Sequence, residues 1–454
     1  MSFFHLPKMM LLLPALLFPP GLFLQAQVSP AVEPAKTSPS PAGTWSGEIQ
    51  VPGMILQIQV EFVKAEAWAG RISIPEQRLK NFALADISVQ GVEVAFKMPG
   101  IPGNPAFKGR MEADGGLRGT FSQGGLSCPF VLSRSATASA PTPSSPDREV
   151  TFPGFNAFPI KGSVRRGQGH GYFAVLVAGS GPTDRDWSSP VIRDQATGKL
   201  LPSHGGRDMA GWLAQQGMGS LRWDKRFIGS MDPKLDISLD AQAGDIRAAL
   251  TFARTLPEAK GKKLLLVGHS EGALLSLLVA KESDALLLLA LPPQSMAKTI
   301  VEQLKLQLPA DRAAVNLAYM EAVFQAIRTN QPTPKAGVEI FPMLETNLAK
   351  PLMRPESLGY VRDTLDLDPW NLAARLSVPC AVAWGDRDVQ TWKPATVPAA
   401  FPGKVIEIPE ANHLFKKETR PRAELNGANA GSAYGDDTPM ADLAPLAAWL
   451  KALK

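Results

Sequence analysis

The stretch that decides the fold runs from Lys263 to Leu278 and reads KLLLVGHSEGALLSLL. It begins with an apolar run typical of a buried strand, and the residues after its second glycine indicate a helix. Between them lies the only G-x-S-x-G of the chain, Gly268-His269-Ser270-Glu271-Gly272. A strand, a tight turn and a helix in this order project the serine hydroxyl clear of the sheet. We therefore predict that Ser270 is a nucleophile.

The two glycines of this motif have a steric explanation. The turn holds Ser270 in a strained backbone conformation, and side chains at Gly268 or Gly272 would collide with the neighbouring strand or helix. A simpler interpretation is a glycine-rich turn between a strand and a helix that has no catalytic role. The strand–turn–helix context favours the nucleophile.

A serine hydroxyl is a weak nucleophile at neutral pH and needs a base. In this setting the partners of the serine follow it along the chain, first an acid and then a histidine. The chain has five histidines, which are His5, His170, His204, His269 and His413. Only His413 follows Ser270, so the order rule selects it as the base, although a lone histidine can also be purely structural.

The acid that orients the histidine should lie at the carboxyl end of another strand. The apolar run Cys380–Trp384 leads directly into Gly385-Asp386-Arg387-Asp388-Val389. We predict that Asp388 is the acid. Asp386 is the alternative, and we interpret it as a turn carboxylate that binds nearby backbone N–H groups.

Acyl transfer also needs hydrogen-bond donors for the oxyanion of the tetrahedral intermediate. One predicted donor is the backbone N–H of Glu271, directly after the nucleophile. The second is assigned to Ser180, with Gly179 as the alternative, because a small glycine-rich loop follows the run Tyr172–Val177. A plain tight turn is the simpler interpretation of this loop. We also hypothesise that the Glu271 carboxylate faces the cleft and attracts a cationic group.

From about Arg148 onward, apolar runs alternate with helical patterns. This alternation predicts an α/β fold, a mostly parallel sheet with helices on both faces. Residues 294 to about 368 are largely helical in pattern and lack a strand-like run. We interpret them as a helical cap over the carboxyl edge of the sheet, and extra helices elsewhere on the sheet are the alternative. The apolar runs are Tyr172–Val177, Ser220–Trp223, Lys263–Val267, Ala285–Leu291, Cys380–Trp384 and Lys404–Ile408.

The N-terminal part predicts a leader, two linkers and a small domain. Residues 1–26 combine a positive charge, an apolar run and a terminal small residue, which predicts a secretory signal peptide. An uncleaved membrane anchor is the alternative. Proline-rich stretches predict linkers at 27–42 and 134–147. Between them, period-two alternation and turn signals predict a small antiparallel all-β accessory domain at 43–133, a barrel or a sandwich, before a catalytic domain at 148–454.

Composition argues against several classes of function. The net charge is only +5 over 454 residues, and no Lys/Arg cluster is interleaved with aromatic residues, so nucleic-acid binding is not expected. Cys128 and Cys380 are too few and too distant for a structural zinc site or a disulfide framework. A single bridge between them is one alternative, and packing as small apolar side chains is the other. We expect neither a metal nor an organic cofactor.

Several of these motifs resemble a bacterial group of α/β-hydrolases described as serine aminopeptidase-like or dienelactone hydrolase-like. Residues 179–186 resemble their G-S-G-P-x-D-R-D loop, residues 222–226 their R-Y-D-K-R-G segment, and residues 268–272 their G-H-S-E-G motif. Phe227 and Ala273 stand where the family usually has glycine. The resemblance implies an α/β-hydrolase fold over about 148–454, and the β module is similar to the N-terminal domain of secreted members.

Charged residues gather near the predicted oxyanion loop. We expect them to form ion pairs that fix this loop rather than to contact substrate, and direct contact is the alternative. They are Asp184, Arg185, Asp186, Asp224 and Arg226.

The leading functional interpretation is a secreted or periplasmic serine hydrolase that cleaves small carboxylic esters. The second is a peptidase or amidase that uses Ser270, Asp388 and His413 on short peptides or amides. The third is a binding protein without catalysis, against which the complete set of three residues argues. After removal of the signal peptide we expect no stable membrane insertion.

Overall fold

The computed structural model describes residues 40–51, 54–74, 79–134, 146–181, 183–188, 203–228, 235–425 and 429–453. The predicted signal peptide, nearly all of the first linker and the central residues 135–145 of the second lie outside these ranges. The chain divides into two compact units, with a boundary between Ser145 and Pro146. Each unit is described by itself.

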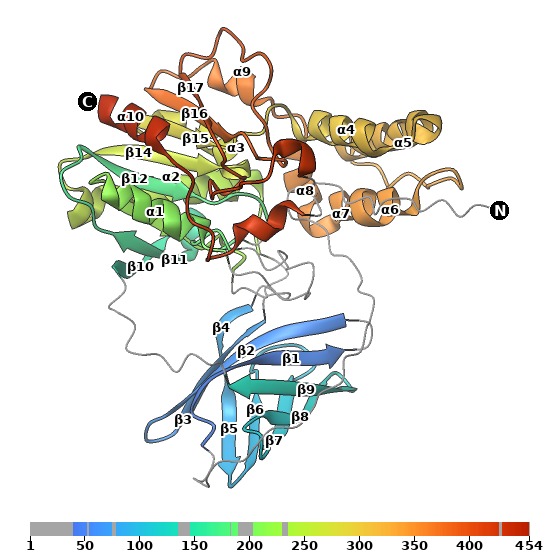
Figure 1. The fold of residues 1–454 in the computed structure, drawn as a ribbon. Coiled ribbons are helices and arrows are strands. Elements are labelled where there is room, and N and C mark those ends of the chain that lie inside the picture. Colours follow the sequence, from blue (N-terminus) through green and yellow to red (C-terminus); the bar gives the residue numbers. More distant parts are fainter. Residues whose placement is uncertain are drawn as a thin grey trace. The chain divides into compact units, whose positions relative to one another are not determined.

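The N-terminal unit contains one nine-stranded antiparallel sheet, with the order β4-β3-β2-β1-β9-β8-β7-β6-β5 (Figure 1). Turns that contain Gly91 and Gly115 join β5 to β6 and β7 to β8. The strands are β1 (Gly43–Val51), β2 (Met54–Lys64), β3 (Trp68–Ile74), β4 (Leu79–Ala83), β5 (Ala85–Gln90), β6 (Glu93–Lys97), β7 (Ala106–Met111), β8 (Leu117–Gln123) and β9 (Leu126–Arg134).

One face of this sheet is filled by aromatic side chains. Phe107 stacks on Phe96 at a centroid distance of 4.5 Å and meets Phe130 edge to face at 5.3 Å. Cys128 is buried in the same cluster and is a free thiol, as is Cys380 of the other unit. The two cysteines therefore pack as small apolar side chains, and the bridge considered above does not form.

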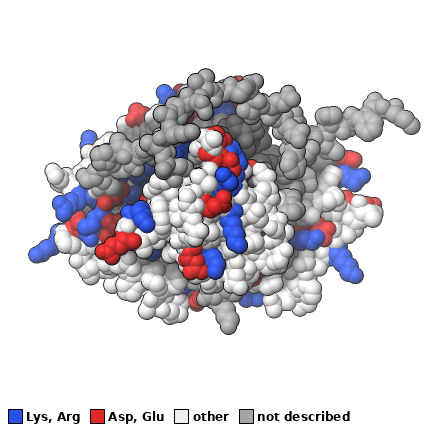
Figure 2. Space-filling model, turned by 90° about the horizontal axis from the view of Figure 1, so that it is seen from below, with Lys and Arg blue, Asp and Glu red and all other residues white. Residues whose placement is uncertain are grey.

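On the face drawn in Figure 2, charged side chains of both signs are scattered among uncharged ones, and neither sign forms a continuous field over the coloured part. Exposed ion pairs of the N-terminal unit, such as Lys97 with Asp86 at 2.9 Å, mix the two signs at close range. This interspersed pattern fits the small net charge of +5.

The C-terminal unit contains an eight-stranded sheet with the order β10-β11-β13-β12-β14-β15-β16-β17. The strands β12 to β17 all run parallel, as the sequence predicts. Strands β10 and β11 add an antiparallel edge, which the sequence analysis did not predict. The strands are β10 (Asp147–Pro153), β11 (Pro159–Arg165), β12 (Tyr172–Val177), β13 (Ser220–Trp223), β14 (Lys263–His269), β15 (Ala285–Leu289), β16 (Cys380–Gly385) and β17 (Lys404–Ile408).

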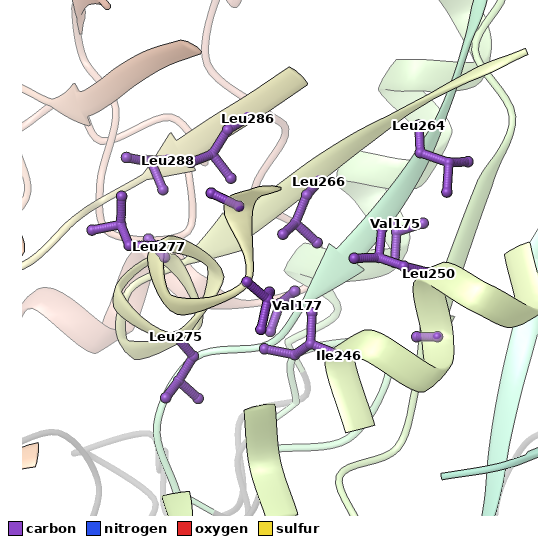
Figure 3. Packing of buried hydrophobic residues seen from close by; sticks show 14 of the residues in the cluster. Val175, Val177, Ile246, Leu250, Leu264, Leu266, Leu275, Leu277, Leu286 and Leu288 are labelled. Carbon is purple, nitrogen blue, oxygen red and sulfur yellow. The ribbon is translucent and has the colours of Figure 1, made fainter. Parts of the chain in front are cut away.

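Successive residues of the central strands point to opposite faces of this sheet, and each face is covered by helices. Leu264 and Leu266 pack with α2 (Leu239–Thr255) and α3 (Glu271–Leu278) on one face (Figure 3). Leu265 and Val267 pack on the other face with α1 (Gly205–Gln215) and α10 (Ala444–Ala452). This two-sided burial explains why the strands read as continuous apolar runs.

The segment between β15 and β16 is largely helical, and its position over the carboxyl edge of the sheet, as the cap that the sequence suggests, stays a prediction. This segment has a hydrophobic cluster of its own, which includes Leu304, Phe324 and Leu348, and helices α4 to α7 extend away from the sheet on one side (Figure 1). Its elements are α4 (Met296–Gln307), α5 (Ala310–Thr329), α6 (Pro342–Leu344), the π-helical turn η5 (Glu345–Ala349), α7 (Lys350–Leu352) and α8 (Pro355–Thr364), after which α9 (Pro369–Ala373) leads to β16.

Short 3-10 turns complete the unit. They are η2 (Phe155–Ala157), η3 (Pro257–Ala259), η4 (Ala280–Glu282), η6 (Arg422–Glu424) and η7 (Ala430–Tyr434). Within the described ranges, no helix combines the length and the apolar character that a membrane span requires.

Candidate active site

Ser270 lies at the tight turn between β14 and α3. Its backbone has φ 56° and ψ −122°, a conformation that costs a residue with a side chain about 1–3 kcal/mol. A Cβ atom on Gly268 would lie 2.4 Å from the carbonyl oxygen of Gly272, and one on Gly272 would lie 2.4 Å from the carbonyl oxygen of Ala178. The turn therefore requires glycine at both positions, for the steric reason that the sequence suggests.

His413 and Asp388 form a buried hydrogen-bonded pair, with 2.7 Å between Nδ1 and Oδ2. Three further donors fill the carboxylate of Asp388, namely the N–H groups of Gln390 and Thr391 and the hydroxyl of Thr391. Burial raises the pKa of Asp388, but the charge of His413 and these hydrogen bonds outweigh burial and hold the pKa below its ordinary value. The carboxylate is thus ionised, so Nδ1 of His413 donates and Nε2 keeps a free lone pair.

Asp386, the alternative acid, has different surroundings. Its Oδ1 is buried without a hydrogen-bond partner among the described residues, and the nearest cation is the guanidinium of Arg387, with 3.7 Å between Oδ1 and Nε. The carboxylate that binds backbone N–H groups of this turn is Asp388 itself, so the turn role that the sequence suggests for Asp386 is wrong. The geometry favours Asp388 as the partner of His413.

The loop that carries His413 packs directly on the loop that carries the acid. Oδ1 of Asn412 accepts a 2.9 Å hydrogen bond from the N–H of Leu414, which fixes the turn around His413. A Cβ atom on Gly385 would lie 2.1 Å from the carbonyl oxygen of Ala411. Glycine at the end of β16 therefore allows the two loops to approach each other.

The predicted oxyanion loop reaches the nucleophile. A Cβ atom on Gly179 would lie 3.2 Å from Cβ of Ser270, so the backbone of this loop lies against the serine. The carbonyl oxygen of Ser180 accepts a 2.6 Å hydrogen bond from the hydroxyl of Thr183, which stabilises the turn. Ser180 and Gly179 thus both lie beside the site, and the assignment of Ser180 and of the Glu271 N–H as donors stays a prediction.

Arg185 anchors the far end of this loop. Its guanidinium forms a two-point contact with Asp224, at 3.1 and 2.7 Å, and its backbone N–H donates to the same carboxylate at 2.9 Å. It also contacts Ser163 at 2.8 Å and Glu149. Burial lowers the pKa of Arg185, but these carboxylates outweigh burial and raise it above its ordinary value.

Asp184 stabilises the same loop by hydrogen bonds inside it, and Asp186 ties the loop to the sheet. Oδ1 of Asp184 accepts from the N–H groups of Asp186 and Ser188 at 2.9 and 3.1 Å. Asp186 in turn pairs with Arg222 of β13 at 2.9 Å. Arg226 differs from expectation, because it pairs with Asp245 of α2 at 2.6 Å rather than with the loop.

The side chain of Glu271 already has a cationic partner. Its Oε2 lies 3.1 Å from Nζ of Lys225, and both side chains are largely buried. Burial, and then the nearby Glu271 carboxylate, raise the pKa of Tyr360 of helix α8 well above its ordinary value. The contact with Lys225 argues against the hypothesis that Glu271 attracts a cationic substrate.

Two residues beside the site escaped the sequence reasoning. His269 accompanies the nucleophile, and its ring lies 4.7 Å from the ring of His413. Trp187 stacks on His269 at 4.6 Å. The position of His269 inside the serine motif could have indicated a role for it at the site. The order rule considered only histidines that follow Ser270, so it excluded His269. Among the described residues, no cluster of three or more His, Cys, Asp or Glu side chains could hold a metal ion.

Part of the chain is similar in sequence to known proteins. Residues 169–425 match the model of the Alpha/beta hydrolase family. Esterase EstD of Thermotoga maritima is 28% identical over 248 residues, which cover 54% of this chain and 52% of the esterase. Polyketide transferase af380 of Aspergillus fumigatus is 36% identical over 83 residues, 18% of this chain and 27% of the transferase. The chain thus spans about half the length, or less, of these relatives.

Solved structures resemble the chain only distantly. An esterase of Pyrococcus furiosus is 16% identical, with a TM-score of 0.37, over 62% of this chain and 88% of the esterase. A proline iminopeptidase of Mycobacterium smegmatis is 15% identical, with a TM-score of 0.36, over 59% of this chain and 92% of the iminopeptidase. These scores are too low to distinguish one activity from another.

Proposed function

Because the chain belongs to the alpha/beta hydrolase family, we propose that it hydrolyses carboxylic esters through an acyl-enzyme on Ser270. The observation that carries this proposal is the 2.7 Å hydrogen bond between His413 and Asp388. The strained turn at Ser270 supports it, because His269, directly before the serine, has its ring 4.7 Å from that of His413. The similarity to esterase EstD supports an ester as the substrate class.

In the proposed acylation step, Nε2 of His413 takes the proton of the Ser270 hydroxyl while Oγ forms a bond to the ester carbonyl carbon. Asp388 stabilises the imidazolium that results. The negative charge on the carbonyl oxygen is stabilised by the N–H of Glu271 and by a donor from Ser180 or Gly179. When the intermediate collapses, the bond to the alkoxy group breaks and His413 returns its proton to that group.

Deacylation repeats these steps with water. His413 takes a proton from a water molecule, whose oxygen attacks the acyl carbon, and then returns a proton to Oγ of Ser270. The products are a carboxylic acid and an alcohol, and the reaction consumes one water. No other reactant is needed.

The paired state of Glu271 supports an ester over an aminopeptidase substrate. An aminopeptidase site must neutralise the ammonium group at the end of its substrate. The carboxylate beside Ser270 is in contact with Lys225 at 3.1 Å, so this position offers little net negative charge to a second cation. We infer that neutral esters are better substrates than amino-bearing amides.

The decisive experiment compares the wild type with Ser270→Ala on two substrate series, short acyl esters of increasing chain length and aminoacyl amides. We expect turnover of esters by the wild type and none by the variant. A serine-reactive fluorophosphonate should label the wild type alone. Faster cleavage of aminoacyl amides than of esters would favour a peptidase, and a wild type that is neither labelled nor active would favour a binding protein.

We also propose that the protein is exported, on the basis of the charged and apolar composition of residues 1–26. N-terminal sequencing of the protein from its native host tests this. A mature chain that begins near Gln27 supports export, whereas an intact Met1 contradicts it.

A further inference from the structure

The ring of His269 lies against two segments that are distant along the chain, the loop that contains Gly179 and Trp187 and the turn that contains His413. Its Nε2 lies 2.8 Å from the backbone carbonyl oxygen of His413. One face stacks on Trp187, with 16° between the ring planes. Its Nδ1 lies on the side of the oxyanion loop, 3.1 Å from the place where a Cβ on Gly179 would be. A residue larger than glycine at position 179 would therefore press against the ring of His269.

These contacts define the protonation of His269. A carbonyl oxygen can only accept, so Nε2 carries the hydrogen and donates it to His413. Burial first, and then the neighbouring His413, lower the pKa of His269 to about 3. The ring therefore stays neutral when His413 becomes an imidazolium, and it adds no repulsive charge at a ring distance of 4.7 Å.

The sheet topology explains why such a contact is needed. The oxyanion loop follows β12 and His413 follows β17, and strands β14, β15 and β16 lie between them. Asp388, at the end of β16, fixes the His413 side chain from its Nδ1 side. His269, at the end of β14, contacts the main chain of His413 and the oxyanion loop together.

We propose that His269 is a positioning residue that sets the distance between the oxyanion loop and the acid–base imidazole of His413. Its Nε2–H holds the His413 main chain, and its stacking on Trp187 fixes the ring. This inference rests on the proposed ester hydrolysis at Ser270, and it assigns His269 no contact with substrate.

The test compares three substitutions of His269 in the full-length chain. His269→Gln can place an amide N–H near the Nε2 position, whereas His269→Asn places it near Nδ1, and His269→Phe keeps the stacking but removes the donor. We expect kcat for a short acyl ester to fall about tenfold to a hundredfold in the Phe and Asn variants. KM should stay within about twofold, and the Gln variant should recover most of the loss.

His170→Phe is the matched control, because Nε2 of His170 also lies near a backbone carbonyl, that of Leu450 at 3.3 Å, but just before the start of β12. We expect it to keep the kcat of the wild type. Fluorophosphonate labelling reports the attack of Ser270 alone. Its rate should fall in the same variants in which kcat falls, because the proposed role of His269 is in that step.

A His269→Phe variant that keeps the wild-type kcat overturns the proposal. If that variant does not fold, equal kcat values for the Gln and Asn variants overturn it instead. Failure of the proposed ester hydrolysis is a distinct result, because the wild type itself would then turn over no ester and would not be labelled by the fluorophosphonate.

Discussion

Asp388 and His413 lie 25 residues apart in the chain, yet their side chains meet at 2.7 Å in an environment closed to solvent. Every other donor around the carboxylate comes from Gln390 and Thr391 of its own loop. The carboxylate is therefore held in one orientation by local contacts before it orients the imidazole. The residues that hold the Asp388 carboxylate in place are thus different from those that hold the His413 main chain.

Ser270→Ala and His413→Ala should each lower kcat/KM for a short acyl ester by at least about a thousandfold, because each removes a partner of the same proton transfer. Ser270→Ala removes one oxygen atom and should leave Tm nearly unchanged, whereas His413→Ala leaves the buried Asp388 carboxylate without its imidazole partner and should lower Tm in a protein that still folds. The double variant should be no worse than the worse single variant. An additive loss would mean that the two residues do not act as a unit.

Asp388→Asn should lower kcat about a hundredfold to ten-thousandfold, less than Ser270→Ala. The amide that this substitution introduces can donate a hydrogen bond to Nδ1 of His413. This favours the tautomer with its hydrogen on Nε2, which cannot accept the proton of Ser270. Asp386→Asn is the matched control and should retain near wild-type kcat. If Asp386→Asn proves the more damaging change, the acid has been assigned to the wrong carboxylate.

Stability should fall in acid because of His269. The unfolded residue has an ordinary pKa of 6.5, whereas the folded one has a pKa of about 3. Below about pH 6.5 the unfolded chain therefore binds more protons, and the free energy of unfolding decreases until the pH approaches 3. The lowered pKa of Asp388 acts in the same direction at the acid end of this range.

Urea denaturation of the C-terminal unit at several pH values, from about 7 to about 4, measures this decrease. His269→Gln removes the titrating group, so its free energy of unfolding should depend less steeply on pH over that range. If the free energy of unfolding of His269→Gln depends on pH as steeply as that of the wild type, other residues cause the loss of stability in acid.

Asp224→Asn should destabilise the protein by about 3–5 kcal/mol, because it leaves the buried Arg185 without its two-point partner. The oxyanion loop depends on this contact, so kcat should also fall. Arg247→Ala serves as the control, since Arg247 forms an exposed pair with Glu282 at 2.9 Å. Exposed pairs contribute about 0–1 kcal/mol, and an equal loss of stability in both variants would contradict the buried-anchor interpretation.

Glu271→Gln should leave the ratio of kcat/KM between neutral and amino-bearing substrates unchanged, because the wild-type carboxylate already faces Lys225. A small decrease in Tm is expected from the loss of this partly buried pair. A marked decrease in activity on amino-bearing substrates alone would restore the role for Glu271 that the sequence suggested.

The sequence predicts those parts of the molecule that depend on local pattern. The apolar run before Ser270 and the two glycines around it predict the strained turn without any knowledge of distant contacts. The order of the motifs along the chain also selects His413 and the strand end that carries Asp386 and Asp388, and the hydrogen bond to His413 then favours Asp388.

What the sequence could not predict depends on contacts across the fold. His269 donates to a carbonyl 144 residues away, and no local pattern marks such a bond. Arg226 pairs with Asp245 of α2 rather than with a carboxylate of the oxyanion loop, and no local pattern marks that pairing either. The edge strands β10 and β11 were missed because their side chains are only partly buried, so they lack the continuous apolar runs of the central strands.

The cap buries its apolar side chains mostly among themselves, whereas the nucleophile turn is constrained by glycines and by the sheet below it. The apolar core of residues 296–364 can therefore be repacked by substitution while the glycines that constrain the nucleophile turn stay as they are.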